Sequence, residues 1–415
     1  MSKLLKKRLS RRIKSTKRSS IREALRLTEN LDIISFGGGL PDSALFPTKI
    51  IEKATISVLS TDSKRILQYG ASEGYMPLKQ ELIKRLIQKE KIKLTAEELI
   101  ITTGSQQGLD IVAKVFLNCE DVVIVEEPSY LGGLMAFRSY GARFIGIPCD
   151  ENGMQVEIIN DKLKNLAKHE INKIKFVYVV PDFQNPGGTT LTLERRKKLI
   201  ELAEKYDFLI VEDTPYKELR YSGKNIPSLF LLAPRGRVIT LCTFSKLLCP
   251  GFRLGYAFSS KDIIFQLATG KQSTDLCTPP FIQAILAKIL KDNELDKHIQ
   301  GLISAYDKKQ KAMLNSLNRY ILPLKISTIE WTKVEGGLFL WVTLPKYIDT
   351  EKMIIKAIEK KVAYVPGTDF YHDGSLKNRM RLNFSSSTIE QIDMGIKRLA
   401  EVIKSEKRRF ENLAK

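Results

Sequence analysis

One segment near the middle of the chain combines a lysine, a serine and an arginine at a spacing that suits covalent chemistry on a bound cofactor. Lys246 comes shortly after a predicted strand, Ser245 precedes it, and Arg253 lies seven residues further on. A Pro250-Gly251 turn folds the arginine back toward the lysine. A lysine amine can condense with an aldehyde, and an arginine with nearby hydroxyls can hold a phosphate. The segment therefore predicts an aldehyde cofactor that carries a phosphate and is joined to Lys246 as an imine.

The chain offers few residues for other common kinds of catalysis. It has only three histidines, far apart in the sequence, so a histidine-based triad is not expected. Its five cysteines form no CxxC pair and are odd in number, which argues against both a disulfide framework and a zinc site. We therefore expect no metal, and this cysteine usage favours a reducing, cytoplasmic compartment.

The elements that would position Lys246 alternate between about residues 98 and 258. Short runs of β-forming residues predict strands at 99–102, 122–125, 143–147, 176–180, 208–211, 238–243 and 254–258. Amphipathic stretches such as 107–117 and 193–206 predict helices between most of them. This order predicts an α/β fold in which a mostly parallel sheet lies between two layers of helices. In such sheets functional groups gather at the carboxyl ends of the strands.

The pattern changes toward the C-terminus. Residues 281 to about 320 predict one long helix. Beyond it, strands are expected at 336–342, 362–365 and 379–384, with helices at 352–360 and 388–404. These elements predict a second, smaller α+β domain. We accordingly divide the chain into an N-terminal basic arm and segment that packs with the small domain (1–46), a large cofactor-binding domain (47–290) and a small C-terminal domain (291–415).

Length and charge set the outer bounds. With 415 residues the chain exceeds the usual size of one core, and no apolar run approaches the roughly 20 residues that span a bilayer, so no membrane partner is expected. The net charge is +20, and nine basic side chains fall within the first 20 residues. We interpret this start as a basic arm, partly helical or frayed. A transit peptide is the alternative, because the segment lacks acids.

Five further sequence strings occur in an order that is specific to one enzyme family. They are SFGGGLP (35–41), LFP (45–47), QYG to GY (68–75), TGSQQ (103–107) and FQNPGG (183–188). Together with the segment around Lys246, they resemble the pyridoxal-phosphate-dependent aminotransferases of fold type I, class I and II. The resemblance covers essentially the whole chain after residue 20, and it is closest to the subgroup with 2-aminoadipate and kynurenine aminotransferases.

The resemblance implies pyridoxal 5′-phosphate as the cofactor and transfer of an α-amino group from an amino acid to a 2-oxo acid such as 2-oxoglutarate. It also implies the fold of this family, a large αβα domain with a smaller α+β domain, and a homodimer with shared active sites. Lys246 would first anchor the cofactor and then act as the general acid and base.

The resemblance also implies roles for residues around the cofactor ring. Asp213, which aligns better than Glu212, would pair with the protonated ring nitrogen. Asn185 and Tyr216 would hydrogen-bond the phenolic oxygen, and Tyr130 would stack on the ring. The family commonly has Asn-Pro-Thr-Gly where this chain has Asn-Pro-Gly-Gly. We therefore expect a looser loop in which the asparagine keeps its role.

A further group would hold the cofactor phosphate. Ser105 and Gln106 lie between a predicted strand and a predicted helix, where backbone N–H groups and the helix dipole attract an anion. Ser245 and Arg253 would complete this phosphate site. Tyr69 resembles the family tyrosine that reaches the phosphate of the neighbouring subunit.

The remaining implied residues face the substrate. Gly39 would permit close backbone approach, and Asn185 would contribute from the cofactor side. Arg381 matches the arginine that grips the α-carboxylate, with Arg379 as a nearby competitor for the role. Arg22 resembles an arginine that a short N-terminal helix supplies to an acidic substrate side chain. The alternative for Arg22 is solvated charge in the basic arm.

Two other functions stay open at this point. The residues around the cofactor do not exclude another reaction on it, such as β-elimination or decarboxylation. The net charge alone favours a MocR-like DNA-binding regulator, but the roughly 30 residues before the first matching string are too few for its winged helix. We therefore expect no nucleic-acid partner. The amino donor is also open between aromatic, aminoadipate, kynurenine-like, branched-chain and glutamate substrates.

Overall fold

The strands predicted between residues 98 and 258 form one eight-stranded sheet in the computed structural model, which describes residues 3–10, 13 and 32–413. In spatial order the sheet contains β2 (Leu99–Thr102), β9 (Gly255–Phe258), β8 (Val238–Thr243), β7 (Leu209–Asp213), β6 (Ile174–Val179), β3 (Val122–Glu127), β4 (Arg143–Asp150) and β5 (Gly153–Met154). From β8 to β4 all neighbours are parallel, whereas β9 is antiparallel to β2 and β8, and β5 to β4. The predicted mostly parallel sheet is thereby confirmed.

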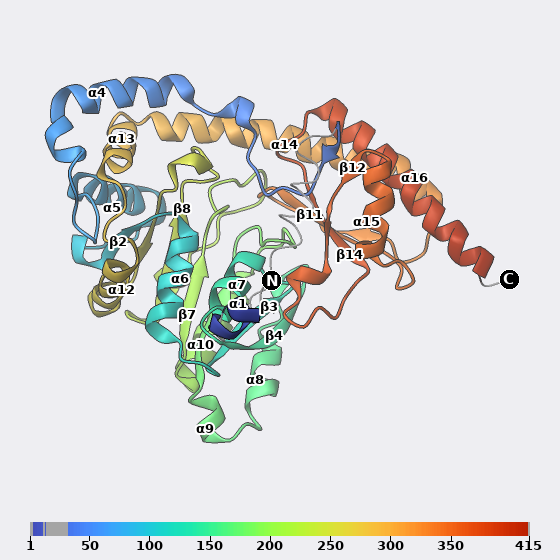
Figure 1. Cartoon of the computed structure of the whole chain (residues 1–415), viewed down its shortest axis with the longest axis horizontal. Helices are drawn as coiled ribbons and strands as arrows, with labels where there is room; N and C mark the ends of the chain where they lie inside the picture. Colours follow the sequence, from blue (N-terminus) through green and yellow to red (C-terminus); the bar gives the residue numbers. More distant parts are fainter. Residues whose placement is uncertain (1–2, 11–12, 14–31, 414–415) are drawn as a thin grey trace.

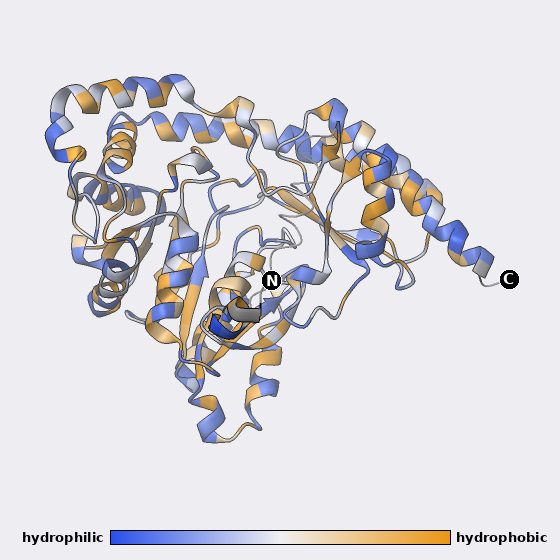
Figure 2. Cartoon of the chain, in the orientation of Figure 1, coloured by the Kyte–Doolittle hydropathy of each residue, from blue (hydrophilic) through white to orange (hydrophobic). Residues whose placement is uncertain are grey.

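Helices cover both faces of this sheet because its central strands are apolar on both sides. Val123 and Val211 belong to one core cluster, while their sequence neighbours Ile124 and Ile210 belong to a second. The first cluster includes α6 (Ser105–Phe116), α7 (Leu131–Arg138) and α12 (Lys261–Asp275), and the second α8 (Glu157–Leu163), α10 (Leu193–Tyr206) and α11 (Leu229–Leu232). Figure 2 shows the resulting contrast between hydrophobic strands and helices of mixed hydropathy.

The helix predicted at 281–320 is two helices, α13 (Pro280–Lys291) and α14 (Glu294–Tyr320). The break falls at Asn293, whose φ of 56° is left-handed, a conformation that asparagine tolerates better than most residues. α13 packs against α4 (Thr48–Ile66) and α5 (Met76–Glu90) of the large domain. α14 is about 40 Å long at 1.5 Å per residue and packs against α16 (Ile389–Leu413), so it links the two domains (Figure 1).

The small domain is built on an antiparallel sheet in the order β10 (Glu330–Trp331), β11 (Phe339–Thr343), β14 (Arg379–Asn383) and β13 (Val365–Pro366). The strand predicted at 362–365 is divided, because β12 (Val362–Ala363) pairs instead with β1 (Ile34–Ser35). α15 (Thr350–Glu359) lies close to its prediction, while α16 extends nine residues beyond the predicted end at 404. Together with the large sheet, this domain confirms the predicted fold class.

The segment after residue 32 runs along the small domain toward the sheet of the large one. Phe36 donates its backbone N–H to the Ala363 carbonyl at 2.8 Å and accepts from the Asn383 N–H at 2.9 Å. These bonds fix the path of the glycine run that follows. The domain boundaries at 46 and 290 stay a prediction.

The other described elements are short. They are α1 (Lys3–Arg8), α9 (Lys168–Ile171) and the 3₁₀ turns η1 (Ser43–Leu45), η2 (Ala96–Glu98), η3 (Pro250–Phe252), η4 (Leu322–Leu324) and η5 (Thr368–Phe370). Within the described ranges, every helix is too short or too polar to cross a bilayer.

Candidate active site

Lys246 lies three residues after the carboxyl end of β8, where the sheet of the large domain faces the small domain. Its Nζ donates to the carbonyl of Gly39 at 2.6 Å, which joins the lysine to the glycine run. Desolvation lowers the pKa of Lys246 from 10.5 to about 8, and the nearby Arg381 and Arg253 cations add to this. A lysine amine that is partly neutral near physiological pH is a competent nucleophile.

Asp213 ends β7, the strand beside β8, and is buried. Its Oδ2 accepts a hydrogen bond from the Tyr178 hydroxyl at 3.0 Å, while its Oδ1 has no partner among the described residues. Burial raises the pKa of Asp213 from 3.8 to about 7, and the Tyr178 bond opposes that rise. An unpaired buried carboxylate oxygen is costly, so this oxygen fits a cationic or N–H partner supplied by a ligand.

The neighbouring Glu212 points to the opposite face of the sheet. It accepts from the backbone N–H of Leu229 at 2.8 Å and from the Thr240 hydroxyl at 3.0 Å. These bonds anchor the start of α11. The alternation of side chains along β7 thus separates Asp213 from Glu212 and gives the second a structural role.

The start of α6 and the turn after Lys246 form a cradle suited to an anion. No side chain caps α6, which begins at Ser105 after Gly104. A Cβ on Gly104 would lie 2.8 Å from Nη2 of Arg253, so the absence of a side chain lets the guanidinium approach this helix end. Nη1 of Arg253 donates to the Ser245 hydroxyl at 3.4 Å. Uncapped N–H groups, a hydroxyl and an arginine together form an arrangement that can bind a phosphate.

Tyr130 and Gln106 stand beside this cradle. Tyr130 precedes α7, and its ring passes so close to Gly132 that a Cβ there would be 2.5 Å away. The side chain of Gln106 donates to the Gly132 carbonyl at 3.0 Å, and its oxygen lies 3.5 Å from the Tyr130 hydroxyl. The aromatic ring predicted to stack on the cofactor is therefore held next to the predicted phosphate site.

Arg381 and Asn185 form the side of the site that belongs to both domains. Nη1 of Arg381 donates to Oδ1 of Asn185 at 2.8 Å, and Nη2 donates to the Gly37 carbonyl at 2.7 Å. Nδ2 of Asn185 donates in turn to the Tyr216 hydroxyl at 3.3 Å. Nε of Arg381 has no acceptor among the described residues. The guanidinium is thus fixed in place, with Nε–H and a second N–H on each terminal nitrogen left for a ligand.

Two rings of the small domain enclose the Arg381 guanidinium. Its central carbon is 4.3 Å from the centroid of Phe339 and 5.2 Å from that of Phe370. Burial lowers the pKa of Arg381 to about 10, so the side chain stays cationic at neutral pH. The competing Arg379 instead donates to the Tyr371 hydroxyl at 2.8 Å. The geometry therefore favours Arg381 as the carboxylate-binding residue.

Two predicted site residues are not part of this cluster in the described chain. Tyr69 lies between α4 and α5 with 78% of its surface exposed. Arg22 lies outside the described residues. The other predicted residues converge on the region between the carboxyl ends of the strands and the small domain.

Sequence reasoning missed a buried network that holds the Asn185 loop. Oε2 of Glu126 accepts from the Val180 N–H at 3.0 Å and from the Gln184 side chain at 3.3 Å, and Gln184 also donates to the Pro128 carbonyl at 2.6 Å. Burial raises the pKa of Glu126 from 4.5 to about 8. The only signal was an acidic pair at the end of a buried strand, and sequence alone does not show which of the two points inward.

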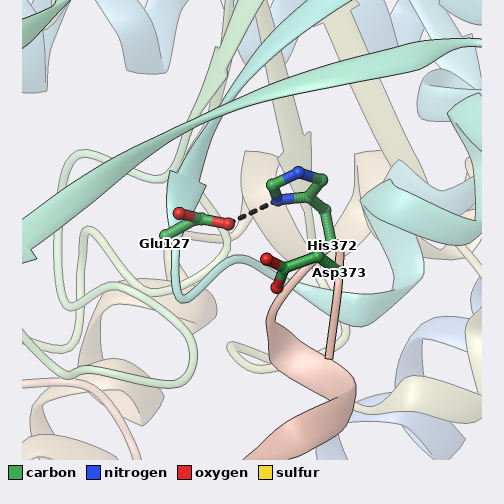
Figure 3. Close-up of side chains that lie close together, drawn as sticks. All are labelled: Glu127, His372 and Asp373. Carbon is green, nitrogen blue, oxygen red and sulfur yellow. Dashed lines mark hydrogen bonds and ion pairs between the residues drawn. The ribbon is translucent and has the colours of Figure 1, made fainter. Parts of the chain in front are cut away.

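Glu127, the next residue, ties the two domains together. Its carboxylate pairs with Nδ1 of His372, and Asp373 lies beside them (Figure 3). The Ser129 N–H also donates to the Phe370 carbonyl at 2.8 Å. Because Glu127 and His372 satisfy each other, we interpret the cluster as a contact that fixes the Phe370 segment.

Comparisons with known proteins identify the family of this chain. The sequence matches the family described as aminotransferase class I and II over residues 32–399. Aromatic-amino-acid aminotransferase 1 of Thermococcus litoralis is 46% identical over 94% of this chain and 92% of its own length. A kynurenine aminotransferase structure from Pyrococcus horikoshii has a TM-score of 0.92 and 45% identity, covering 97% of this chain and 98% of its own.

A more distant solved structure shows the same architecture. The α-aminoadipate aminotransferase of Thermus thermophilus has a TM-score of 0.88 and 33% identity, covering 98% of this chain and 100% of its own. The chain therefore belongs to the aminotransferase class I and II family and has its fold type I architecture. It is a transaminase, as the resemblance in its motifs implied.

Proposed function

We propose that this chain is a pyridoxal-phosphate-dependent aminotransferase of broad range that transfers the α-amino group of aromatic, kynurenine-like or 2-aminoadipate donors to 2-oxoglutarate. The relatives are named for aromatic amino acids, kynurenine and α-aminoadipate. One observation carries the proposal: three functional groups meet in one site. They are the Lys246 amine with its lowered pKa, the buried Asp213 carboxylate with one unpaired oxygen, and the Arg381 guanidinium beside the Phe339 ring.

The residues present fit the cofactor. Oδ1 of Asp213 lacks a partner, the start of α6 lacks a cap, and Arg253 lies against Gly104 at that helix end. A protonated ring nitrogen and a phosphate would meet these needs. When bound, pyridoxal phosphate supplies an electron-withdrawing ring that stabilises negative charge on the α-carbon of the amino acid.

On this proposal, Lys246 anchors the cofactor through its amine. Asp213 holds a proton on the ring nitrogen, since a carboxylate favours the cationic form of its partner. Asn185 and Tyr216 hydrogen-bond the phenolic oxygen, and Tyr130 covers one face of the ring.

The cofactor phosphate would be held at the start of α6. The backbone N–H groups of Ser105 and Gln106, with the Ser245 hydroxyl and Arg253, would bind it. Charge-assisted hydrogen bonds of this kind would hold the cofactor through its phosphate.

Arg381 binds the substrate carboxylate. Its fixed guanidinium and unpaired Nε orient the amino acid, and Gly39 leaves room for the substrate beside its backbone. Lys246, once released from its anchoring role, would take the proton from the α-carbon of the donor and deliver it to the former aldehyde carbon of the cofactor. In the second half of the transfer it would move a proton in the opposite direction. Its lowered pKa suits both directions near neutral pH, because a general base works best when its pKa is close to the working pH.

The proposal includes a homodimer in which Tyr69 reaches the phosphate of the partner subunit. The largely exposed side chain of Tyr69 supports this role, because its phenol is accessible to a second chain. The proposal further includes a cytoplasmic location, for which all five cysteines being free is the supporting observation.

A panel of amino donors with 2-oxoglutarate tests the proposed function. The wild-type protein is expected to form glutamate from aromatic, kynurenine and 2-aminoadipate donors, and Lys246→Ala is expected to form none. If Arg22 recognises an acidic side chain, Arg22→Ala should lower the rate with 2-aminoadipate and leave the aromatic donors unchanged. Oxo-acid formation that does not depend on 2-oxoglutarate would contradict transamination.

A further inference from the structure

The carboxylate of Asp213 has one oxygen committed to the protein and one left for a ligand. Oδ2 accepts from the Tyr178 hydroxyl at 3.0 Å, and Oδ1 has no partner in the described chain. Among the described residues no other hydrogen bond reaches this carboxylate, so the Tyr178 hydroxyl is the contact that fixes which oxygen is left free. Tyr178 lies on β6, next to β7, where its residue pairs in register with Val211.

The Tyr178 hydroxyl is fixed in position by the packing of its ring. The ring is fully buried and lies edge-on to Phe137, with centroids 5.3 Å apart. A Cβ on Gly133 would come within 2.8 Å of the ring, so α7 approaches closely only because this residue is glycine. The ring therefore cannot swing away from Asp213 without repacking α7.

The hydroxyl also keeps its proton. Burial raises the pKa of Tyr178 far above its ordinary value of 10.0, so the phenol is neutral and donates at every working pH. A neutral donor bonded to a carboxylate stabilises the charged form of that carboxylate, whereas burial of Asp213 favours the neutral form. Tyr178 is the one described side chain that counters the effect of burial on Asp213 by a hydrogen bond.

We propose that Tyr178 is a positioning residue that orients Asp213 and keeps it ionised as the partner of the cofactor's ring nitrogen. The inference rests on the proposed function, because it takes pyridoxal phosphate to be the group that Asp213 faces. Without the Tyr178 hydroxyl, Asp213 would be free to turn and would more readily be neutral, and a neutral acid pairs poorly with a protonated ring nitrogen.

The ring nitrogen itself provides the test. Cofactor-free protein is titrated with pyridoxal phosphate and with its analogue in which carbon replaces the ring nitrogen, and the ratio of the two dissociation constants is measured. Tyr178→Phe keeps the ring and removes only the hydroxyl. It is expected to weaken pyridoxal phosphate binding about tenfold to a hundredfold, the range for a hydrogen bond to a charged group, and to leave analogue binding within about twofold.

Each other outcome overturns the proposal. Equal weakening of both ligands would show that the hydroxyl serves only packing, and no weakening of either would show that it does not act on Asp213. Tyr178→4-aminophenylalanine keeps both the shape and a donor, so it is expected to retain the preference for pyridoxal phosphate. If the phenylalanine variant fails to fold, loss of that preference in the amino variant would itself refute the proposal.

Two further variants separate this inference from the proposed function. Asp213→Asn should abolish the preference of the wild-type protein for pyridoxal phosphate over the analogue. If it does not, the pairing of Asp213 with the ring nitrogen is wrong, whatever Tyr178 does. Tyr216→Phe is the matched control, since it removes a buried phenol hydroxyl at the same site but away from Asp213. It should weaken both ligands alike and leave their ratio unchanged.

Discussion

Three ionisable side chains in the site have pKa values moved toward neutrality by the same cause. Desolvation lowers the pKa of Lys246 to about 8 and of Arg381 to about 10, and it raises that of Asp213 to about 7. Each shift disfavours the charged form, as burial must. Without ligands, keeping these buried side chains charged therefore costs free energy of folding. The cofactor and substrate would carry the opposite charges and so reduce this cost.

The lowered pKa of Lys246 sets the pH at which the protein takes up its cofactor. Attachment to an aldehyde requires the neutral amine, so its rate in cofactor-free protein should rise with pH and level off above about 8. The rate is followed by absorbance after mixing with pyridoxal phosphate. A rate that keeps rising to pH 10 would mean that the amine titrates near its ordinary value of 10.5.

Asp213 should destabilise the cofactor-free protein at neutral pH. Its pKa is raised from 3.8 to about 7 on folding, so its favourable contribution is present below pH 4 and is lost as the pH rises through 7. Asp213→Asn removes the penalty, and cofactor-free protein carrying it should exceed wild type in free energy of unfolding by roughly 2–4 kcal/mol at pH 8. At pH 5 the gain should be smaller.

Denaturant unfolding at both pH values, at one protein concentration, measures this difference. Titrating groups that do not interact with Asp213 are common to both proteins, so their contributions cancel. The charge of Asp213 also raises the pKa of Glu126, so its removal adds to the gain at pH 8 in the same direction. A gain that is equal at the two pH values, or absent at both, would contradict the raised pKa of Asp213.

Some functional residues could be predicted from the sequence and others could not, for a physical reason. Asp213, Asn185 and Arg381 were predicted because each lies in a short string of consecutive residues that resembles the family. Tyr178 and Glu126 were missed because their roles depend on partners across neighbouring strands and loops. Tyr178 lies in a run that predicted only a buried strand, and its hydrogen bond to Asp213 is visible only once β6 and β7 are side by side.

Among the elements, the start of α6 depends most on one glycine. Gly104 has φ 77° and ψ 166°, a backbone conformation that is essentially restricted to glycine and costs other residues about 1–3 kcal/mol. Gly104→Ala would also push against the Arg253 guanidinium, 2.8 Å from the new Cβ. The variant is expected to weaken binding of pyridoxal phosphate about tenfold or more, and binding of phosphate-free pyridoxal much less.

Gly251→Ala is the control for this prediction, because a Cβ at that position would meet nothing within 4 Å. It lies two residues before Arg253 in the same turn and should bind both compounds as wild type does. Equal losses for the two compounds in Gly104→Ala, measured by equilibrium titration, would show that this helix end does not bind the phosphate.

The same scale shows what periodicity can predict about elements. All seven strands predicted for the large domain are present, because continuous apolar runs mark strands buried on both faces. The helix at 281–320 was wrong as a single element, since its helical pattern hides the left-handed turn at Asn293. The strand at 362–365 was wrong as one strand, because its two halves pair with β1 and β14, which are far apart in sequence.

For the whole molecule, the prediction with most consequence is that two chains share each site. Tyr69→Ala should impair activity without unfolding the chain, since the side chain is 78% exposed. Lys246→Ala should be inactive. In an equal mixture of refolded chains, half of the dimers are mixed and each holds one intact site, so about a quarter of wild-type activity should return. No gain over the separate variants would place Tyr69 in its own subunit's site, or in none.

The site joins residues that are far apart in the sequence, from Gly37 to Arg381, and no local sequence pattern predicts contacts over such separations. Composition and periodicity predicted a large parallel sheet and a second domain. Arg381 and Asn185 could be assigned to one site from the sequence only because the order of the motifs resembles that of a known family. The contact between Glu127 and His372, which holds the domains against each other, had no signal in the sequence at all.

The central claim is that Lys246 carries the cofactor, and chemical trapping tests it most directly. Purified protein is given pyridoxal phosphate, the adduct is reduced with borohydride, and the digested peptides are analysed by mass. The account predicts one phosphopyridoxyl group per chain on the peptide that contains Lys246, and none on that peptide in Lys246→Ala. A label found only on other lysines, or no label, would contradict it.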